Sequence, residues 1–421
     1  MQMTANAAST NPVFAEPGWP AVVVAGGFHT AVVLMRNLQR RGLETHCIDS
    51  NPRNSAFQSI YGQAHLCPNA DSQSAEWLQF MIDLSRRIGR RPVLISSSDQ
   101  YVTAMALHAD ALEPYYLFHR SSAAVQGLLA TKKRQYSIAD DYGLPVPVTR
   151  FVRSFAEVDA FAAAARFPVI LKPLHFREWK TISREHPLFE KKLIVIPDRA
   201  GLEKQYRLAA AINPEMVIQE MIEGPDSAKL VYLSCYDRGS RRIGHSVMRQ
   251  VRTDPIYFGS ASLVEPIPDE DAATLCDQFL RKLHYVGICE IELKRDTRDG
   301  RVKMIEANPR YSVTADAATY AGVDLGWLHY LELIDQPVVP AEPNGKPFRH
   351  ICLFRDFASF RDYIRDGLLT WREFLLSYRG SKENPVHFFD FDWYDRRLAL
   401  GTLRLVAKLL VAPAFRRFRP R

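Results

Sequence analysis

Apolar runs alternate with helix-spaced segments throughout the N-terminal part of the chain. Residues 21–27 form an apolar run that ends in two glycines, and residues 30–41 follow with the spacing of a helix. Residues 44–49 and 93–99 are expected to form later strands. Strands that alternate with helices favour a parallel sheet covered on both faces. We therefore expect a Rossmann-like α/β domain over residues 20–128.

Further along, the sequence predicts a hairpin of two strands with a turn at the Asp-Gly pair 299–300. Several acidic residues lie on these strands. Side chains two residues apart share a face of a strand, so Glu290 and Glu292 lie on one face. For the same reason the hairpin can bring Glu292, Glu306 and Asn308 together. Such hard oxygen ligands suit Mg²⁺, or Mn²⁺, rather than a soft metal. The alternative is a solvated hairpin with charged outer faces.

Lysines stand upstream at two points where a phosphate could be bound. Lys172 ends an apolar run that begins at Phe167, and Lys132 lies in the segment Thr131-Lys132-Lys133 that opens a predicted helix ending at Gly143. Between these two lysines and the hairpin, a predicted strand at residues 217–220 leads into a turn that carries acidic residues. A lysine after a buried run can also simply extend its ammonium group into water.

The order of these motifs resembles the ATP-grasp superfamily of carboxylate–amine ligases. The order is lysine, helix, Gly-x-Pro-x-Pro segment, strand with lysine, Gln-Glu strand and acidic hairpin, and it covers about residues 20–335. Within that superfamily the chain looks like the ATP-dependent carboligases related to D-aspartate ligase. This closer likeness rests on four segments, Ile95–Tyr101, Arg252–Ser260, Tyr285–Lys294 and Ile305–Tyr311.

The resemblance implies how ATP would be bound. Lys132 and Lys172 would reach its phosphates as compact point charges. The backbone of Glu220-Met221-Ile222 would read the edge of the adenine ring. Either Glu223 or Asp226 would accept hydrogen bonds from the ribose hydroxyls, and the sequence does not separate the two.

The resemblance also implies a reaction, in which a carboxylate attacks the γ-phosphorus of ATP and an amine then displaces phosphate from the acylphosphate. The three hairpin oxygens would bind two metal ions, and Arg310 would stabilise the transferring group. Arg249 and Arg252 could hold the carboxylate substrate by paired hydrogen bonds, or could form surface salt bridges. Asp99, at the end of a predicted strand, could help form the acceptor site or cap the next helix.

One departure from the family's pattern concerns the loop after Lys172. Many ATP-grasp enzymes cover the phosphates with a glycine-rich loop, but no glycine lies between Lys172 and Lys191. Either this loop closes over phosphate through side chains, at a greater entropic cost, or the protein binds ATP with little turnover. The polar residues available in the loop are Arg177, Lys180, Thr181, Ser183 and Arg184.

The sequence suggests five segments in all. They are a disordered N-terminus (1–19), the Rossmann-like domain (20–128), a two-lobed ATP-grasp domain (129–335), a linker with a small helical appendix (336–394) and a basic amphipathic tail (395–421). The tail carries eight basic residues and one acidic residue, which accounts for the net charge of +7. It could contact an anionic membrane surface, or pack as a terminal helix on its own domain. The balanced remainder gives no reason to expect nucleic-acid binding.

Composition narrows the class of protein further. Six scattered cysteines without a C-x-x-C pair predict a reducing compartment and argue against a zinc or disulfide framework. No apolar run is long enough to span a bilayer, and the polar start of the chain predicts no signal peptide. The glycine pair at 26–27 lacks the G-x-G-x-x-G pattern of dinucleotide-binding oxidoreductases. We expect a cytoplasmic protein, with contact to the inner membrane face as an open alternative.

Three functions stay open on the sequence alone. The favoured one is an ATP- and Mg²⁺-dependent carboxylate–amine ligase that forms an amide through an acylphosphate and releases ADP and phosphate. Its substrates would be a small carboxylate and an amine, such as an amino acid or a lipid-linked molecule. The alternatives are an ATP-grasp phosphotransferase acting on a hydroxyl and a membrane-recruited ATP-binding scaffold with little turnover.

Overall fold

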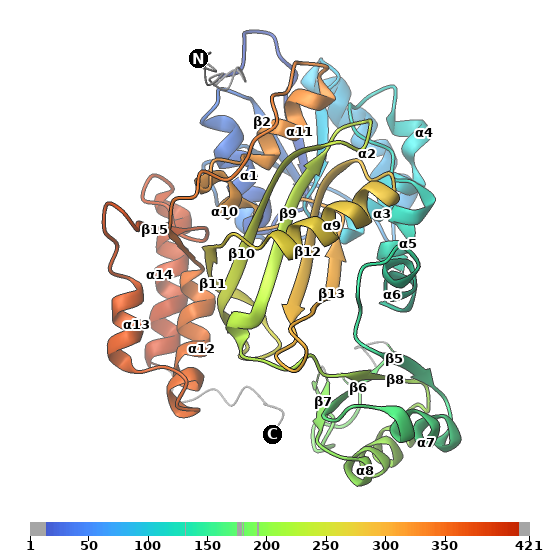
Figure 1. Ribbon diagram of the computed structural model, residues 1–421. Coiled ribbons are helices and arrows are strands. Elements are labelled where there is room, and N and C mark those ends of the chain that lie inside the picture. Colours follow the sequence, from blue (N-terminus) through green and yellow to red (C-terminus); the bar gives the residue numbers. More distant parts are fainter. Residues whose placement is uncertain (1–13, 131, 175–178, 180, 192, 412–421) are drawn as a thin grey trace, which may run out of the picture. The chain divides into compact units, whose positions relative to one another are not determined.

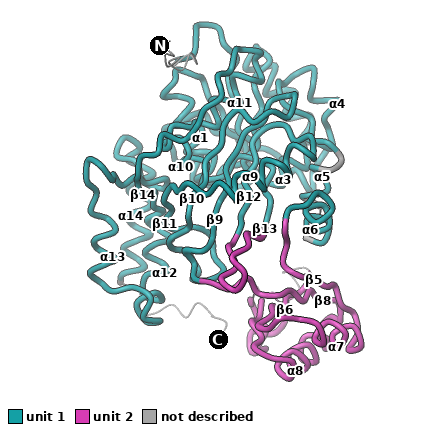
Figure 2. Tube along the Cα trace, in the orientation of Figure 1, with its two compact units in different colours: residues 1–144, 225–293, 306–411 teal, residues 145–224, 294–305, 412–421 magenta. Residues whose placement is uncertain are grey.

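A computed structural model describes residues 14–130, 132–174, 179, 181–191 and 193–411 of the chain (Figure 1). These residues divide into two compact units, which Figure 2 draws in different colours. Unit 1 comprises the residues up to 144 together with 225–293 and 306–411, and unit 2 comprises 145–224 and 294–305. The units divide the chain at other points than the domains expected from the sequence, and those domain boundaries stay predictions.

The N-terminal part of unit 1 is built on a four-stranded parallel sheet, as the sequence predicted. In the order β3-β2-β1-β4, β1 (Val22–Ala25) pairs with β2 (Thr45–Asp49) and β4 (Val93–Ser96), and β3 (Gln63–Leu66) extends β2. Every residue of β1 is buried because helices cover both faces of the sheet. The helices of this part are α1 (His29–Gln39), α2 (Ser74–Ile88), α3 (Asp99–Leu107), α4 (Ala109–Leu112), α5 (Ala123–Ala130) and α6 (Lys132–Asp141).

Successive residues of β1 point to opposite faces and so join two hydrophobic cores. Val22 and Val24 pack in the core that contains α1, while Val23 and Ala25 pack in the core that contains residues of α2 and α3. The alternation explains why the run carries no polar residue, since both faces of the strand are covered.

A seven-stranded sheet forms the larger part of unit 1, in the order β13-β12-β9-β10-β11-β14-β15. The pairs β9–β10, β10–β11 and β11–β14 are antiparallel, and β14 pairs with β15 in parallel. The predicted hairpin is confirmed as two strands, β12 and β13, joined at Gly300 with its positive φ of 71°. The elements are β9 (Lys229–Tyr236), β10 (Arg242–Asp254), β11 (Ser260–Pro266), α9 (Glu270–Lys282), β12 (Gly287–Arg295), β13 (Val302–Asn308), α10 (Ala315–Tyr320), α11 (Leu325–Leu333), β14 (Arg349–Ile351) and β15 (Val386–Phe388).

The C-terminal region is part of this sheet, which corrects the expectation of a purely helical appendix. β14 and β15 extend the sheet at β11, and three helices accompany them, α12 (Leu353–Arg365), α13 (Trp371–Ser377) and α14 (Arg396–Val411). α14 packs on unit 1 through a buried stripe of Leu398, Thr402 and Val406, four residues apart. Residues 412–421 of the predicted amphipathic tail lie outside the described residues. Among the described helices, none combines the length and the apolar character needed to cross a bilayer.

Unit 2 is a small α/β unit around an antiparallel sheet of order β5-β8-β6-β7. Its own hydrophobic core joins the apolar faces of the sheet and the two helices around the fully buried Trp179. The elements are β5 (Thr149–Val152), α7 (Phe155–Ala164), β6 (Val169–Pro173), β7 (Ile194–Ile196), α8 (Arg199–Ala210) and β8 (Met216–Glu220).

A buried polar cluster ties α1 to α10 and β14 inside unit 1. Arg36 Nη2 lies 2.7 Å from Asp316 Oδ2, and Asn37 Nδ2 donates to Asp316 Oδ1 at 2.9 Å. His350 Nε2 lies 2.9 Å from Asp316 Oδ2. Burial alone would raise the pKa of Asp316, but Arg36 and His350 outweigh it and hold the pKa below its usual range. The carboxylate is therefore charged at neutral pH and fully paired.

A pair of histidines on adjacent strands predicts an acid-sensitive fold. His46 Nδ1 on β2 lies 3.1 Å from His65 Nε2 on β3. Burial lowers the pKa of both rings, and the charge of His46 lowers that of His65 further. Below about pH 6.5, the ordinary pKa of histidine, the unfolded chain therefore binds more protons at these two rings than the folded protein does. The contribution of the pair to stability is complete above that pH and decreases as the pH falls. We expect the urea midpoint to drop between pH 7.5 and 5.5, and His65→Gln to reduce the drop. The control is His284→Asn, at an exposed histidine, which should leave the drop unchanged. A drop in His65→Gln as large as in the wild type would refute the assignment.

Candidate active site

A cavity of about 700 Å³ opens in unit 1 at the carboxyl ends of the parallel strands. One wall comes from the segments that follow β1, β2 and β4, which is where ligands bind in open α/β sheets. The rest of the lining includes residues of the β12–β13 hairpin, of α12 and α14, and of β10 and β11. Its lining is highly charged, with four carboxylates (Asp99, Glu290, Glu292, Glu306) and three arginines (Arg53, Arg310, Arg355).

The turn after β1 brings the backbone close to this cavity. Gly26 has a φ of +125°, which favours glycine, and a Cβ on Gly27 would lie 2.8 Å from that of Asp49. Gly27 N–H donates to Asp49 Oδ2 at 2.7 Å. The glycine pair therefore allows the ends of β1 and β2 to lie close together. The chain then continues directly to His29 in the cavity wall.

The hairpin places all three predicted metal ligands on the cavity. Glu292, Glu306 and Asn308 line it together. The strands fold this way because the alternate residues of β12, including Ile291 and Leu293, are fully buried in the core. Three hard oxygen donors on one wall fit Mg²⁺ or Mn²⁺, and the donor set contains no sulfur or imidazole.

Glu290 is a cavity residue to which the sequence analysis assigned no role. Its Oε1 accepts a hydrogen bond from Asn308 Nδ2 at 3.1 Å, and its Oε2 accepts one from Ser312 Oγ at 2.5 Å. Burial raises the pKa of Glu290. Because the amide nitrogen of Asn308 donates to Glu290, the amide oxygen of Asn308 points away from Glu290. This oxygen is the predicted metal ligand, so the contact with Glu290 orients it.

Arg310 is held at the edge of the acidic cluster. Its Nε donates to Asp99 Oδ1 at 2.6 Å, and its Nη2 donates to Asn308 Oδ1 at 3.2 Å. Burial alone would lower the pKa of Arg310, but Asp99, Glu290 and Glu306 outweigh it and raise the pKa. The guanidinium therefore stays charged beside the three predicted metal ligands. Asp99 is the first residue of α3, and its side chain also binds Arg310 in the cavity.

The structure brings neither Arg249 nor Arg252 to this cavity. Arg252 is buried and makes a bidentate pair with Asp356, with Nε–Oδ1 at 2.8 Å and Nη2–Oδ2 at 2.6 Å. Arg249 pairs with Glu265 on the neighbouring strand at 2.9 Å. Arg249 therefore forms the surface salt bridge that the sequence analysis held open as the alternative, whereas the salt bridge of Arg252 is buried.

Other cavity residues come from distant parts of the chain and carry no local motif. Arg355 lies on α12, where its Nη1 donates to Ala261 O at 3.3 Å, and His29 begins α1. Within the described residues, His29 Nδ1 and Gln250 Oε1 are buried and have no hydrogen-bond partner. Burial lowers the pKa of His29, so its ring is neutral. These orphaned atoms point to a polar ligand, because buried polar groups are usually paired.

Most of the predicted nucleotide-binding residues lie in unit 2, on the neighbouring strands β6 and β8 and in the segment that follows β8. Lys172 on β6 donates from Nζ to Gln219 Oε1 at 3.3 Å, and Glu220 on β8 accepts from Arg166 N at 2.9 Å. Met221 follows, with its N–H bound to Pro168 O at 3.1 Å. Ile222 is buried and Glu223 is partly exposed.

The remaining candidates for nucleotide binding lie in unit 1. Asp226 is buried, accepts hydrogen bonds from Tyr363 Oη at 2.6 Å and Tyr257 N at 3.0 Å, and pairs with Lys229 at 3.2 Å. Lys132 is the first residue of α6, within the segment expected to open this helix, but its side chain lies outside what the structure describes. The glycine-free loop is described only in part, since Arg177 and Lys180 lie outside the described residues.

No family model matches the chain. D-aspartate ligase of Enterococcus faecium (strain Aus0004) is 26% identical over 247 residues, which cover 56% of this chain and 57% of that enzyme. N5-carboxyaminoimidazole synthetase from Staphylococcus aureus matches with a TM-score of 0.61 and 13% identity, over 84% of this chain and 88% of that one. L-amino acid ligase from Bacillus licheniformis matches with a TM-score of 0.53 and 15% identity, over 75% and 74% of the two chains.

These comparisons confirm the predicted resemblance to ATP-grasp ligases related to D-aspartate ligase. At such low identities the solved structures establish the fold alone. The chain spans little more than half the length of the D-aspartate ligase that it matches.

Proposed function

We propose that this chain, which resembles the ATP-grasp ligases, is an ATP- and Mg²⁺-dependent carboxylate–amine ligase. The observation that carries the proposal is the cavity wall on which Glu292, Glu306, Asn308 and Arg310 meet. The similarity to D-aspartate ligase and the fold shared with L-amino acid ligase support an amino acid as one substrate.

The chemistry requires positioned charge rather than a nucleophilic side chain. The carboxylate oxygen of the substrate attacks the γ-phosphorus of ATP, the bond from γ-phosphorus to the bridging oxygen breaks, and ADP leaves. The amine then attacks the acyl carbon, loses its proton, and displaces phosphate to leave the amide. Mg²⁺, when bound by Glu292, Glu306 and Asn308, neutralises phosphate charge. Arg310 stabilises the charge on the transferring group, and Asp99 holds Arg310 in place.

The nucleotide-binding roles assigned from the sequence are kept in the proposal. Lys132 and Lys172 bind phosphate oxygens, and the backbone at Glu220-Met221-Ile222 binds adenine. Between the two candidates for ribose, the structure favours Glu223, because the carboxylate of Asp226 is already bound by a tyrosine hydroxyl, a backbone N–H and a lysine.

The test is ADP release with Mg²⁺ across a panel of carboxylates, with hydroxylamine as the trapping amine. We expect carboxylate-dependent ADP release and a hydroxamate product. Phosphate transferred to a hydroxyl, without hydroxamate, would instead identify a phosphotransferase. ATP binding without ADP release on any carboxylate would favour the scaffold.

Arg355 gives a prediction about the carboxylate-binding side of the site. It is the guanidinium on the α12 wall of the cavity, so it can pair with a substrate carboxylate. Loss of a charge-assisted hydrogen bond should raise KM for the acid roughly 10–100-fold in Arg355→Met. Steady-state kinetics with the acid varied at saturating ATP measure this change.

The matched variant is Arg249→Met, which removes the same group outside the cavity, on β10. We expect it to leave KM for the acid unchanged. A larger effect in Arg249→Met than in Arg355→Met would return the carboxylate-binding role to the residue expected from the sequence.

A further inference from the structure

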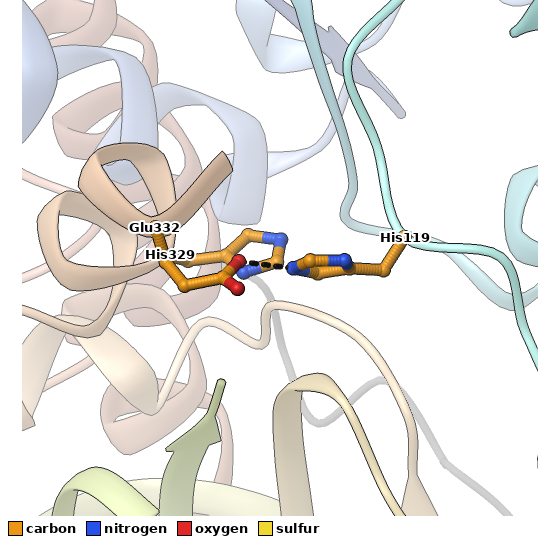
Figure 3. Close-up of side chains that lie close together, drawn as sticks. All are labelled: His119, His329 and Glu332. Carbon is orange, nitrogen blue, oxygen red and sulfur yellow. Dashed lines mark hydrogen bonds and ion pairs between the residues drawn. The ribbon is translucent and has the colours of Figure 1, made fainter. Parts of the chain in front are cut away.

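Three side chains with metal-binding atoms meet in unit 1, outside the cavity of the proposed ligase site. His329 and Glu332 lie on α11, and His119 lies in the segment before α5. Figure 3 shows the three side chains directed toward one another. His119 Nε2 contacts Glu332 Oε2 directly, and one candidate ligand atom from each residue lies within 4.8 Å of the others.

The helix fixes two of these groups in advance. Residues three apart lie on the same face of a helix, so His329 and Glu332 project together. α11 is capped by Asp324, whose Oδ1 accepts from Trp327 N at 3.1 Å, and all of its residues are buried. The two ligand positions therefore sit on a rigid support, as a preorganised site requires.

His329 provides an independent sign that a ligand belongs here. Its side chain is buried, at 7% exposed, and its Nδ1 has no hydrogen-bond partner among the described residues. A buried imidazole nitrogen without a partner is unusual, because the cost of removing it from water is not recovered.

The surroundings also suit a bound ion. A cavity of about 90 Å³ is lined by both His119 and His329, which gives room for a few waters to complete a coordination shell. On the other side of Glu332, the N–H and Nε of Arg238 bind Oε1 at 3.1 and 3.2 Å. This contact orients the carboxylate and leaves Oε2 directed at His119, in the manner of an outer-shell partner.

We propose that His119, His329 and Glu332 bind one Zn²⁺ ion. Two imidazole nitrogens and one carboxylate oxygen, with a remaining position for water, form a common zinc ligand set. Imidazole favours Zn²⁺ over Mg²⁺, so this site differs in chemistry from the all-oxygen set on the hairpin. The ion joins α11 to the segment before α5, two parts of unit 1 that are distant in sequence, and so stabilises the fold.

The experiment uses the full-length chain, freed of metal with a chelator and dialysed. Zn²⁺ is titrated by calorimetry with excess Mg²⁺ present to occupy the hard-oxygen site, and thermal melting is recorded with and without Zn²⁺. We expect one Zn²⁺ per chain and a rise in Tm, since an ion that binds only the folded state stabilises it. His119→Asn should weaken Zn²⁺ binding at least about 100-fold and remove the rise in Tm.

His284→Asn is the matched control. His284 lines the same small cavity, is exposed, and has a φ of +49°, which asparagine tolerates. It should bind Zn²⁺ like the wild type. Glu332→Gln, which keeps the size of the side chain, gives a second test if His119→Asn does not fold. Absence of Zn²⁺ binding to the wild type, or equal affinity in the variants and the wild type, would overturn the proposal.

Discussion

Glu306→Gln is expected to lower carboxylate-dependent ADP release about 10³-fold or more, because under the proposed function it removes a charge that would hold the metal on the transferring phosphate. Glu306 lies on the cavity wall beside Glu292 and Asn308, and its charge contributes to raising the pKa of Arg310. The amide keeps the size of the side chain, so packing should change little. The measurement is kcat for ADP formation, together with Tm to verify folding.

The matched control is Glu265→Gln, a carboxylate on β11 that pairs with Arg249 and does not line the cavity. It should retain the wild-type kcat. If Glu306→Gln folds and keeps a kcat within a few-fold of the wild type, the hairpin is not the metal-binding wall.

Asp316→Ala is expected to lower the free energy of unfolding by about 3–5 kcal/mol, the largest stability effect that we predict. The substitution leaves the Arg36 guanidinium buried, at 2% exposed, without its closest carboxylate at 2.7 Å. It also removes the acceptor for Asn37 and the partner of His350. Urea unfolding at pH 7 measures the change.

Two comparisons make this prediction specific. Asp110→Ala breaks an ion pair with Arg120 in which the Asp110 side chain is 92% exposed, and it should cost no more than about 1 kcal/mol. The double variant Arg36→Met/Asp316→Leu should regain part of the lost stability, because it removes both charges. A loss in Asp316→Ala as small as in Asp110→Ala would show that the buried pair is not required.

The parts of the site that the sequence predicted are those specified locally. The hairpin could be recognised because period-two alternation and an Asp-Gly turn lie within one short segment. The helix that begins near Lys132 could be predicted for the same reason, since the residues that open it and Gly143 at its end lie within one short segment. In each case the pattern and the structure depend on residues that are neighbours in the chain.

The parts that the sequence missed depend on long-range packing. Arg252 has the residue type of a carboxylate-binding group, but its partner Asp356 comes from α12, 104 residues away. Arg355 reaches the cavity only because β14 joins the sheet and carries α12 with it. Glu290 was visible on the correct face, yet its contacts with Asn308 and Ser312 needed the folded hairpin.

The central claim is that ATP activates a substrate carboxylate by transferring a phosphoryl group to it. The most direct measurement uses the acid identified in the carboxylate panel, labelled with ¹⁸O in both carboxyl oxygens. Mass spectrometry of the released phosphate follows, with ATP, Mg²⁺ and the amine present. We predict one ¹⁸O in each phosphate, because the carboxylate oxygen that attacks phosphorus leaves with it. Phosphate free of ¹⁸O, at the same rate of ADP release, would contradict the claim.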